Sequence, residues 1–332
     1  MNITVIGAGS WGTTLTILLA KNGHNVTLWV YESDLAEKML SSRENTLYLP
    51  GHLIPDNVKI TTSLDEALES QELIVNVVPT QFIRSVFSSL KTKLNEGQII
   101  VTASKGVEKN SLLTVTGILK NLFGHAYKYA VLSGPSFASE VVKENPAAVS
   151  VAAQDGEVAL LLQKVFNTSY FRVYRNNDVT GVELGGALKN VIAIASGISD
   201  GLGFGHNTRA ALITRGLAEI VRLGVKMGAE ARTFSGLSGL GDLVLTCTGD
   251  LSRNRTVGLK LGQGTTLKEI LEAMHMVAEG VETTLSAYNL ALKVGVEMPI
   301  VEQVYKVLYN EKDPHEAVSN LMMRTYRQEF DE

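Results

Sequence analysis

Residues 2–12 read NITVIGAGSWG, and they carry the clearest signal for the fold of the first half of the chain. Residues 2–6 are rich in β-branched side chains, which predicts a buried strand. Gly7, Gly9 and Gly12 then fit the pattern G-x-G-x-x-G where a helix is expected to begin. In that setting the glycines allow a tight turn, a close approach of the backbone to a pyrophosphate, and close packing of helix on strand. The alternative is a glycine-rich turn without a ligand, but the position after an N-terminal strand favours a dinucleotide site.

After this motif, the first half of the chain alternates short apolar runs with helical patterns. Further strands are expected at residues 25–30, 73–78, 98–102, 129–132, 148–152 and 171–174, and helices at residues 13–21, 81–94 and 157–166. This alternation predicts an α/β fold with a doubly wound parallel sheet of the Rossmann type.

The second half shows almost no strand pattern, only helical segments broken by glycines. Residues 176–178, Asn-Asn-Asp, offer a loop and a helix N-cap between the two regimes. We therefore expect a dinucleotide-binding domain over residues 1–180 and an all-helical substrate and catalytic domain over residues 181–332.

Composition excludes several classes of protein. The 332 residues are 45% hydrophobic and 19% charged, which is typical of a globular chain and not of a disordered one. The net charge of −4 argues against a nucleic-acid binder. The most apolar stretch, residues 191–198, is too short to span a bilayer. With a single cysteine, Cys247, and no targeting segment, the chain is expected to be cytoplasmic and not inserted in a membrane.

The end of the second expected strand bears on the choice between NAD and NADP. Tyr31 and Glu32 stand there, and an acidic residue at this place accepts from a ribose 2′-hydroxyl and favours NAD. Alternatively Glu32 is a solvated loop residue and Arg43 pairs with a 2′-phosphate. Use of both cofactors is therefore expected.

Lys189 lies in an otherwise uncharged apolar stretch, followed by Asn190. A buried lysine has a lowered pKa, which suits proton transfer near neutral pH. The alternative is a lysine at the edge of a helix whose ammonium reaches solvent. The sequence leaves both open.

Residues 236–255 are the densest in polar chemistry. Glycines flank Asp242, Thr246 follows at helical spacing, and then come Ser252, Arg253, Asn254 and Arg255. Arginine offers a planar fork for phosphate oxygens, and serine and asparagine add neutral donors. A small phosphorylated substrate is expected, against the alternative of a solvated helix start with surface arginines. Cys247 is expected to be a small buried hydrophobe.

Two further segments follow expected strands, at the edge where α/β folds bind ligands. Lys105 lies in the first, and Gly134 and Ser136 lie in the second, which can present backbone N–H groups to an anion. The six histidines show no ligand spacing, so no metal is expected.

These motifs together resemble NAD(P)-dependent sn-glycerol-3-phosphate dehydrogenase of the bacterial soluble type. The resemblance is carried, in chain order, by the segments GAGSWG at 7–12, SKG at 104–106, SGPSFA at 133–138, ELGGALKN at 183–190, GLGDLVLTCT at 239–248 and SRNR at 252–255. It implies reduction of dihydroxyacetone phosphate to sn-glycerol 3-phosphate, a precursor of phospholipids, with NAD(P)H.

The resemblance also implies a role for individual residues. Lys189 becomes the catalytic acid/base, supported by Asn190 and Thr246. The residues implied to hold the substrate, besides Lys189, are Lys105, Gly134, Ser136, Asp242, Ser252, Arg253 and Asn254. Those implied to line the cofactor are Gly7, Gly9, Ser10, Trp11, Gly12, Tyr31, Lys105, Ala138, Arg253, Val277 and Glu279.

Relatives of this type often carry a basic residue just after the second strand, where Tyr31 and Glu32 stand here. A related dehydrogenase of a β-hydroxyacid or phosphogluconate is the alternative enzyme, and a dinucleotide sensor without catalysis is the alternative outside enzymes. Members of the family often form homodimers, so a homodimer is open for this chain.

Overall fold

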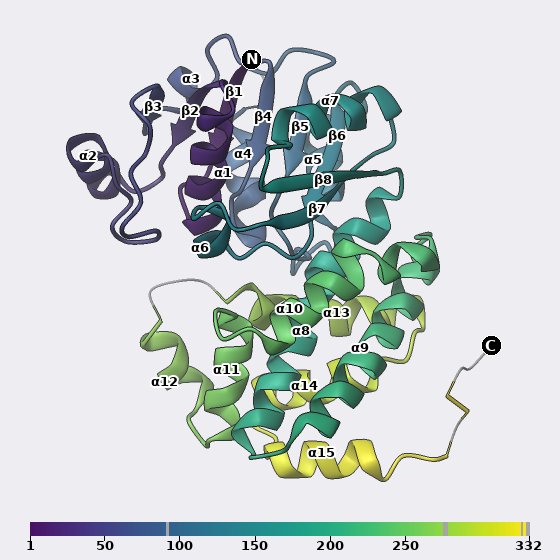
Figure 1. Ribbon diagram of the computed structural model, residues 1–332. Coiled ribbons are helices and arrows are strands. Elements are labelled where there is room, and N and C mark those ends of the chain that lie inside the picture. The colour runs from purple at the N-terminus through teal and green to yellow at the C-terminus, as the bar shows by residue number, and fades with distance from the viewer. Residues whose placement is uncertain (91–92, 275–277, 327, 330–332) are drawn as a thin grey trace.

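The structure, a computed structural model, describes residues 1–90, 93–274, 278–326 and 328–329. It has a part built on a sheet and a part built of helices, one above the other in Figure 1. The strands are β1 (Asn2–Ile6), β2 (Asn25–Trp29), β3 (Val58–Thr61), β4 (Leu73–Asn76), β5 (Ile99–Thr102), β6 (Lys128–Ser133), β7 (Ala147–Ala153) and β8 (Phe171–Asn176). The helices between them are α1 (Ser10–Lys21), α2 (Ser33–Ser42), α3 (Leu64–Ala67), η1 (Thr80–Phe82), α4 (Ile83–Ser88), α5 (Val115–Phe123), α6 (Ala138–Val141) and α7 (Gly156–Phe166).

The strands form one sheet in the order β3-β2-β1-β4-β5-β6-β7-β8. Its first six strands have the order of a dinucleotide-binding fold, in which strands are added on one side of β1 up to β3 and on the other side from β4 onward. The expectation of a parallel sheet holds for every pair except β6 and β7, which are antiparallel. The connection between these two strands contains only the one-turn helix α6, so the chain turns back instead of crossing a face of the sheet.

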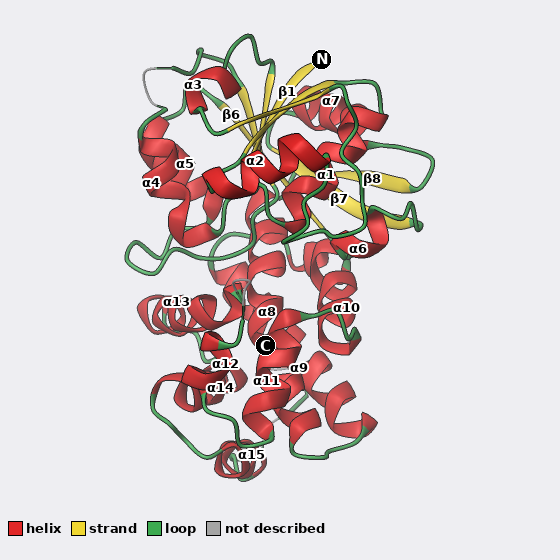
Figure 2. Ribbon diagram, turned by 90° about the vertical axis from the view of Figure 1, so that its left-hand side faces the viewer, coloured by secondary structure: helices red, strands yellow, loops and turns green. Residues whose placement is uncertain are grey.

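Helices cover both faces of the sheet (Figure 2), with α1 and α7 on one face and α4 and α5 on the other. Each face has its own hydrophobic core. The central strands read as continuous apolar runs because both of their faces are buried.

All the strands expected from the sequence are present, within a few residues of the expected bounds. The sequence analysis missed β3, a four-residue strand at the edge of the sheet. The single helix expected at residues 81–94 was wrong, because η1 precedes it and α4 ends at Ser88. There the hydroxyls of Ser88 and Ser89 donate to the backbone oxygens of Arg84 and Val86, and such local side-chain bonds compete with continuation of the helix.

The second part consists of α8 (Val179–Gly201), α9 (His206–Lys226), η2 (Ala231–Ser235), the π-helical turn η3 (Leu237–Gly241), α10 (Asp242–Thr248), α11 (Arg253–Gly262), α12 (Leu267–Glu272), α13 (Glu279–Val294), α14 (Pro299–Tyr309) and α15 (Pro314–Met322). Asp178 caps α8 as expected, since its carboxylate accepts from Gly181 N at 2.8 Å. Around α8 pack α9, α10, α11 and α13.

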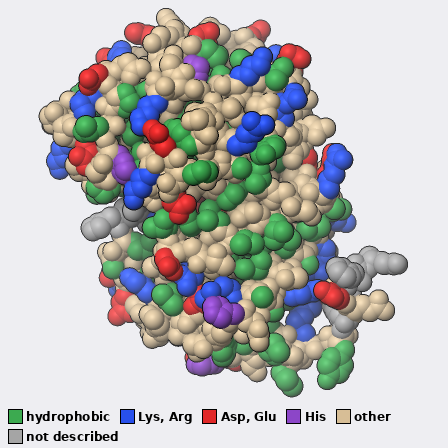
Figure 3. All heavy atoms as spheres, in the orientation of Figure 1, with side chains coloured by type: hydrophobic (Ala, Val, Ile, Leu, Met, Phe, Trp, Pro, Cys, Tyr) green, Lys and Arg blue, Asp and Glu red, His purple; other side chains and the backbone are tan. Residues whose placement is uncertain are grey.

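The apolar stretch around residues 191–198 is longer than expected, because it belongs to the 23-residue α8. By length and composition alone this helix could cross a membrane, but its apolar window is entirely buried inside the protein. Helix α8 is therefore the central helix of the second part. On the face shown in Figure 3, hydrophobic side chains gather where the two parts meet.

Candidate active site

The loop between β1 and α1 has the shape that its glycines predict. Gly7 has φ of 112°, and a Cβ there would lie 2.9 Å from the carbonyl carbon of Val77. At Gly12 a Cβ would lie 1.9 Å from Gly7 O, so helix and loop touch only because that atom is missing. Gly9, by contrast, faces open space and caps α1 without a side chain. An anionic pyrophosphate fits at this helix start, where the loop leaves room for it.

The cofactor candidates beside this loop come from several elements. Trp11 packs against Phe171 with ring centroids 6.3 Å apart, and the carbonyl oxygen of Ala138 lies 3.4 Å from Thr14 Oγ1. Ser10 opens α1. Val277 lies outside the residues that the structure describes.

The end of β2 offers an exposed tyrosine and an exposed glutamate, Tyr31 and Glu32. Glu32 Oε1 accepts from Tyr48 Oη at 3.0 Å. Arg43 points elsewhere, since its guanidinium donates to the carbonyl oxygens of Pro55 and Val58. These contacts give Arg43 partners within its own loop, whereas Glu32 stays at the carboxyl edge of the sheet, where a ribose is expected.

A cluster of four polar side chains, three of them buried and Lys105 half-buried, lies between the two parts of the molecule. Lys189 Nζ, from α8, lies 2.5 Å from Asp242 Oδ1 and 2.7 Å from Thr246 Oγ1. Lys105 Nζ, from the loop after β5, lies 2.6 Å from Asp242 Oδ2. One carboxylate thus bridges two ammonium groups, so the cluster carries a net positive charge that would attract an anionic substrate. We call these four residues the lysine cluster.

Burial is the largest influence on Lys189, and it lowers the pKa of that lysine to about 8. The Asp242 carboxylate opposes the shift, and the Lys105 ammonium adds to it. The reading of Lys189 as an ammonium that reaches solvent is wrong, because its side chain is buried and bonded to Asp242 and Thr246. A lysine with a pKa near 8 exchanges its proton readily at physiological pH.

Glycines of α8 let the neighbouring elements come close to the lysine cluster. A Cβ at Gly185 would lie 2.6 Å from Ser238 O, in the turn that leads to Asp242. A Cβ at Gly186 would lie 2.6 Å from Ser133 Oγ and close to the stem of Lys105. The paired glycines therefore let the turn before Asp242 and the stem of Lys105 come close to α8, next to Lys189.

The loop after β6 lies beside Lys105. Gly134 O accepts from Lys105 Nζ at 3.2 Å and from Ser136 Oγ at 3.0 Å. Gly134 has φ of 148°, and a Cβ there would lie 2.8 Å from Val149 Cα, so this position requires glycine. The structure thus brings three of the predicted substrate residues together.

The residues of the segment 252–255 make different contacts. Ser252 caps α11 by accepting from Arg255 N, and Asn254 Oδ1 accepts from Gly280 N at 3.0 Å. Arg255 is bound within the protein, by Asp200 at 2.8 Å and Asp250 at 2.9 Å. The two arginines therefore do not form one cationic cluster: Arg255 is held by carboxylates, whereas Arg253 is exposed and its charge acts on Glu279.

Glu279, on α13 of the helical part, contacts the sheet part of the molecule at Thr80. Its Oε1 accepts from Thr80 N at 2.9 Å, at the start of η1. Burial raises the pKa of the Glu279 carboxyl, whereas the bond from Thr80 and the charge of Arg253 act in the opposite direction. Neither Thr80 nor the carboxylate of Glu183 was given a role from the sequence, because a contact between distant segments leaves no local pattern.

The structure also shows the surroundings of Asn190 and Cys247. Asn190 is buried, and its backbone oxygen lies where α13 packs on α8 at Gly280. Cys247 is buried as expected, and burial raises the pKa of its thiol to about 12. Within the described ranges, no three histidine, cysteine or acidic side chains gather in a way that would hold a metal ion.

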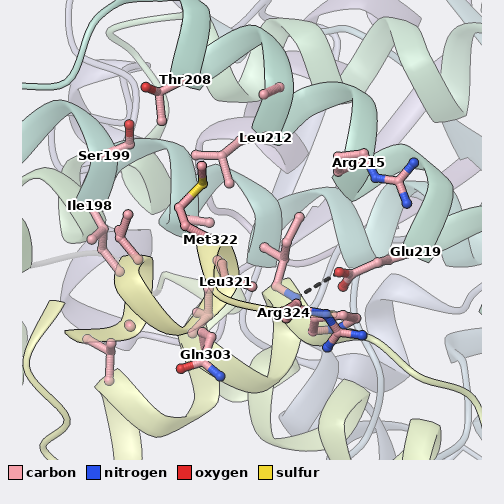
Figure 4. A pocket seen from close by; sticks show the side chains of 18 of the residues that line it. Ile198, Ser199, Thr208, Leu212, Arg215, Glu219, Gln303, Leu321, Met322 and Arg324 are labelled. Atoms are coloured by element: carbon pink, nitrogen blue, oxygen red, sulfur yellow. Dashed lines mark hydrogen bonds between the residues drawn. The ribbon is translucent and has the colours of Figure 1, made fainter. Parts of the chain in front are cut away.

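An apolar cavity of about 380 Å³ lies elsewhere, among α8, α9, α14 and α15 (Figure 4). Glu219 projects from α9 on its wall and accepts from the N–H groups of Ile300 and Val301, at the start of α14. Burial raises the pKa of the Glu219 carboxyl to about 7. Next to the cavity, Met322, Met323 and Tyr326 are exposed.

Comparison with known proteins gives consistent results along the whole chain. Residues 2–159 match the family model described as NAD-dependent glycerol-3-phosphate dehydrogenase N-terminus, and residues 178–319 match the one described as its C-terminus. Relatives named glycerol-3-phosphate dehydrogenase [NAD(P)+] include one from Syntrophotalea carbinolica, 55% identical over 100% of both chains, and one from Citrifermentans bemidjiense, 59% identical over 98% of both. A solved glycerol-3-phosphate dehydrogenase from Coxiella burnetii is 42% identical, with a TM-score of 0.94 over 97% of this chain and 99% of that one.

Proposed function

Because the chain belongs to the NAD-dependent glycerol-3-phosphate dehydrogenases, we propose that it interconverts dihydroxyacetone phosphate and sn-glycerol 3-phosphate with NAD(H) or NADP(H). The observation that carries the proposal is the lysine cluster, in which Lys189 contacts Asp242 beside the loops that follow β5 and β6. The glycine loop after β1 fits a pyrophosphate on the same side of the molecule.

In the reducing direction, two transfers convert the ketone to the alcohol. A reduced nicotinamide cofactor, held at the glycine loop after β1, would supply the hydride that the ketone carbon receives. Lys189, as its ammonium form, donates a hydrogen bond to the ketone oxygen and then gives that oxygen its proton. The lysine is left neutral and is recharged by a proton from solvent, and the oxidising direction runs the same steps backwards.

Asp242 and Thr246 hold Lys189 in place for this proton transfer. Thr246 Oγ1 donates to Asp242 O at 2.6 Å, so its lone pairs are turned toward the ammonium of Lys189. The ammonium is thereby oriented by two acceptors, with its third hydrogen left for the substrate. Asn190 supports the packing of α8 beside this group.

The phosphate of the substrate is expected near Arg253. Arg253 is exposed as a residue, although burial of its guanidinium lowers its pKa, and Ser252 and Asn254 fix the start of α11 around it. Lys105, Gly134 and Ser136 would hold the glycerol end on the opposite side. Binding energy gained at the phosphate would then hold the carbonyl in position at Lys189.

The alternatives are not favoured. A dehydrogenase of β-hydroxyacids or phosphogluconate would not be expected to match the family over both parts of the chain. A sensor without catalysis would have no use for a buried lysine with a lowered pKa.

We propose further that the protein works in the cytoplasm and supplies glycerol 3-phosphate for phospholipid synthesis, with domains at residues 1–180 and 181–332. The exposed Met322, Met323 and Tyr326 beside an apolar cavity support a homodimer through this end of the helical part. Light scattering on the protein and on a Met323→Glu variant would measure its mass in solution.

The deciding experiment follows the absorbance of the reduced nicotinamide with dihydroxyacetone phosphate as substrate, once with NADH and once with NADPH. Oxidation of either cofactor, dependent on the ketone, is the expected result. No turnover with either cofactor would refute the proposed function.

A further inference from the structure

The loop that carries Lys105 folds back on itself. Residues 103–114 join β5 to α5, and Val107 pairs with Thr114 in an antiparallel bridge. The bridge brings the far end of the loop next to the segment that holds Lys105. A displacement of Thr114 therefore also displaces Lys105.

Glu183, on α8, accepts three hydrogen bonds from Thr114 and Thr116 at the far end of this loop. Its Oε1 accepts from Thr116 N at 2.7 Å, and its Oε2 accepts from Thr116 Oγ1 at 2.5 Å and from Thr114 Oγ1 at 2.9 Å. Thr114 is the N-cap residue of α5 but gives no side-chain cap of its own. A carboxylate from the other part of the molecule thus caps α5.

The carboxylate of Glu183 is buried, so these contacts are not shared with solvent. Burial raises the pKa of its carboxyl, and the bonds from Thr116 and Thr114 act in the opposite direction. A buried carboxylate that loses its donors is strongly destabilised, which makes the contact specific for this geometry.

Helix α8 is therefore connected to the loop of residues 103–114 at two places. The lysine cluster ties α8 to the loop through Lys189, Asp242 and Lys105, and Glu183 ties α8 to the other end of that loop. Glu183 precedes Lys189 by six residues on α8, about 9 Å along the helix axis. Both ties act over a short, rigid stretch of one helix.

We propose that Glu183 is a positioning residue for the reaction: through Thr114 and Thr116 it holds the loop against α8, so that Lys105 stays on Asp242. The proposal rests on the role of Lys189 given above. Asp242 then keeps one oxygen for each lysine, and Lys189 keeps its place between the two parts of the enzyme. Small errors in such placement reduce the rate strongly.

Loss of this tie has a predictable electrostatic effect. If Lys105 moves away from Asp242, the carboxylate acts on Lys189 alone, and the repulsion between the two ammonium groups weakens. Both changes favour the charged form of Lys189. The pH above which reduction slows should therefore rise, while the rate at its maximum should fall.

The experiment compares Glu183→Ala and Glu183→Gln with a matched pair, Glu219→Ala and Glu219→Gln. Glu219 is also a buried glutamate that caps a helix, α14, but it lies at the apolar cavity. For each variant one measures kcat/KM for dihydroxyacetone phosphate against pH, the primary isotope effect with deuterated NADH, and the melting temperature.

In Glu183→Ala, kcat/KM should fall on the order of 10²-fold, its alkaline limb should move to higher pH, and the isotope effect should increase. Glu183→Gln should recover much of the loss, because its amide oxygen accepts from Thr116 N and the threonine hydroxyls can turn to accept from its NH₂ group. Glu219→Ala should have a lower melting temperature than the wild type. The alkaline limb of its pH profile and its isotope effect should be those of the wild type.

The proposal would be overturned if Glu183→Ala had a lower melting temperature but the alkaline limb and the isotope effect of the wild type. Glu183 would then be a structural cap of α5. If that variant does not fold, Thr114→Val removes one of the three bonds, and an unchanged limb there overturns the proposal equally. Failure of the proposed function shows differently, as no turnover of dihydroxyacetone phosphate by the wild-type enzyme, and failure of the role of Lys189 shows as a wild-type kcat in Lys189→Ala.

Discussion

Lys189 Nζ lies 2.5 Å from Asp242 Oδ1 at the junction of the two parts, and both side chains are buried. Burial disfavours the ammonium and the carboxylate favours it, and burial has the larger effect on the pKa of Lys189. Burial, partly offset by the ion pair, thus brings the pKa of Lys189 to about 8 instead of its usual value.

Reduction needs Lys189 as the ammonium, so kcat/KM for dihydroxyacetone phosphate should fall as the pH rises through about 8. Oxidation of glycerol 3-phosphate needs the neutral amine and should increase over the same range. In Asp242→Asn the favourable charge is lost, the pKa of Lys189 should fall further, and the limb of the reduction profile should move to lower pH. Initial rates over a pH series in both directions test this, and a limb that stays in place would assign the titration to another group.

Lys189→Ala should lower kcat by roughly 10²–10⁴-fold, the usual contribution of a general acid/base. Binding of the cofactor, measured by fluorescence quenching, should survive because the glycine loop is untouched. Lys189→Arg should not restore the rate, since an arginine does not give up its proton. A kcat like that of the wild type in Lys189→Ala would refute the assignment.

Arg253→Ala should raise KM for dihydroxyacetone phosphate and lower kcat, because the phosphate anchor also places the carbonyl. Unphosphorylated dihydroxyacetone with the wild-type enzyme should behave in the same way. Arg255→Ala is the matched control: it breaks ion pairs to Asp200 and Asp250, so it should reduce stability and leave the preference for the phosphorylated substrate intact. Loss of cofactor affinity alone in Arg253→Ala would contradict the placement of the phosphate.

Glu32→Gln should improve kcat/KM for NADPH more than for NADH, because a carboxylate at the ribose repels a 2′-phosphate. The difference should be larger at low ionic strength. The wild-type enzyme should use both cofactors. Asp34→Asn, an exposed acidic residue in the first turn of α2, serves as control. Equal effects of Glu32→Gln on the two cofactors would place Glu32 away from the ribose.

The pKa of about 7 at Glu219 predicts a stability that depends on pH. The folded chain holds this proton more tightly than the unfolded chain, so the free energy of unfolding should decrease as the pH rises from about 4.5 to 7. The loss is on the order of 3 kcal/mol. Glu219→Gln should flatten this part of the curve, as measured by urea denaturation over a pH series. A wild-type curve already flat there would mean that Glu219 titrates normally.

Local patterns in the sequence were enough for most of the fold. The run of residues 2–12 predicts strand, turn and helix because each step depends on neighbouring residues only. The reversed strand β7 could not be foreseen, since strand direction depends on the path of the connection and leaves no mark on the strand itself. The edge strand β3 was missed because its sequence, VKIT, contains an exposed lysine, whereas the equally short β4 and β5 belong to continuous apolar runs.

The active site shows the same contrast between features that neighbouring residues determine and contacts that only packing determines. Lys189 stands out as a charge in an apolar helix, and the structure confirms that it is buried. Its sharing of Asp242 with Lys105 joins residues more than a hundred positions apart, and only packing determines such a contact. Arg253 and Arg255 look equivalent in the sequence, but Asp200 and Asp250 engage only Arg255.

Helix α8 has a consequence for synthesis of the protein on the ribosome. The chain completes α8 at Gly201, yet α11, which packs on it extensively, is complete only at Gly262. At the usual rate of translation this interval lasts roughly 3–12 s. During that time an apolar helix of membrane-spanning length has no finished pocket to enter, so the nascent chain needs protection, by a chaperone or by the sheet part already folded, until its partners emerge.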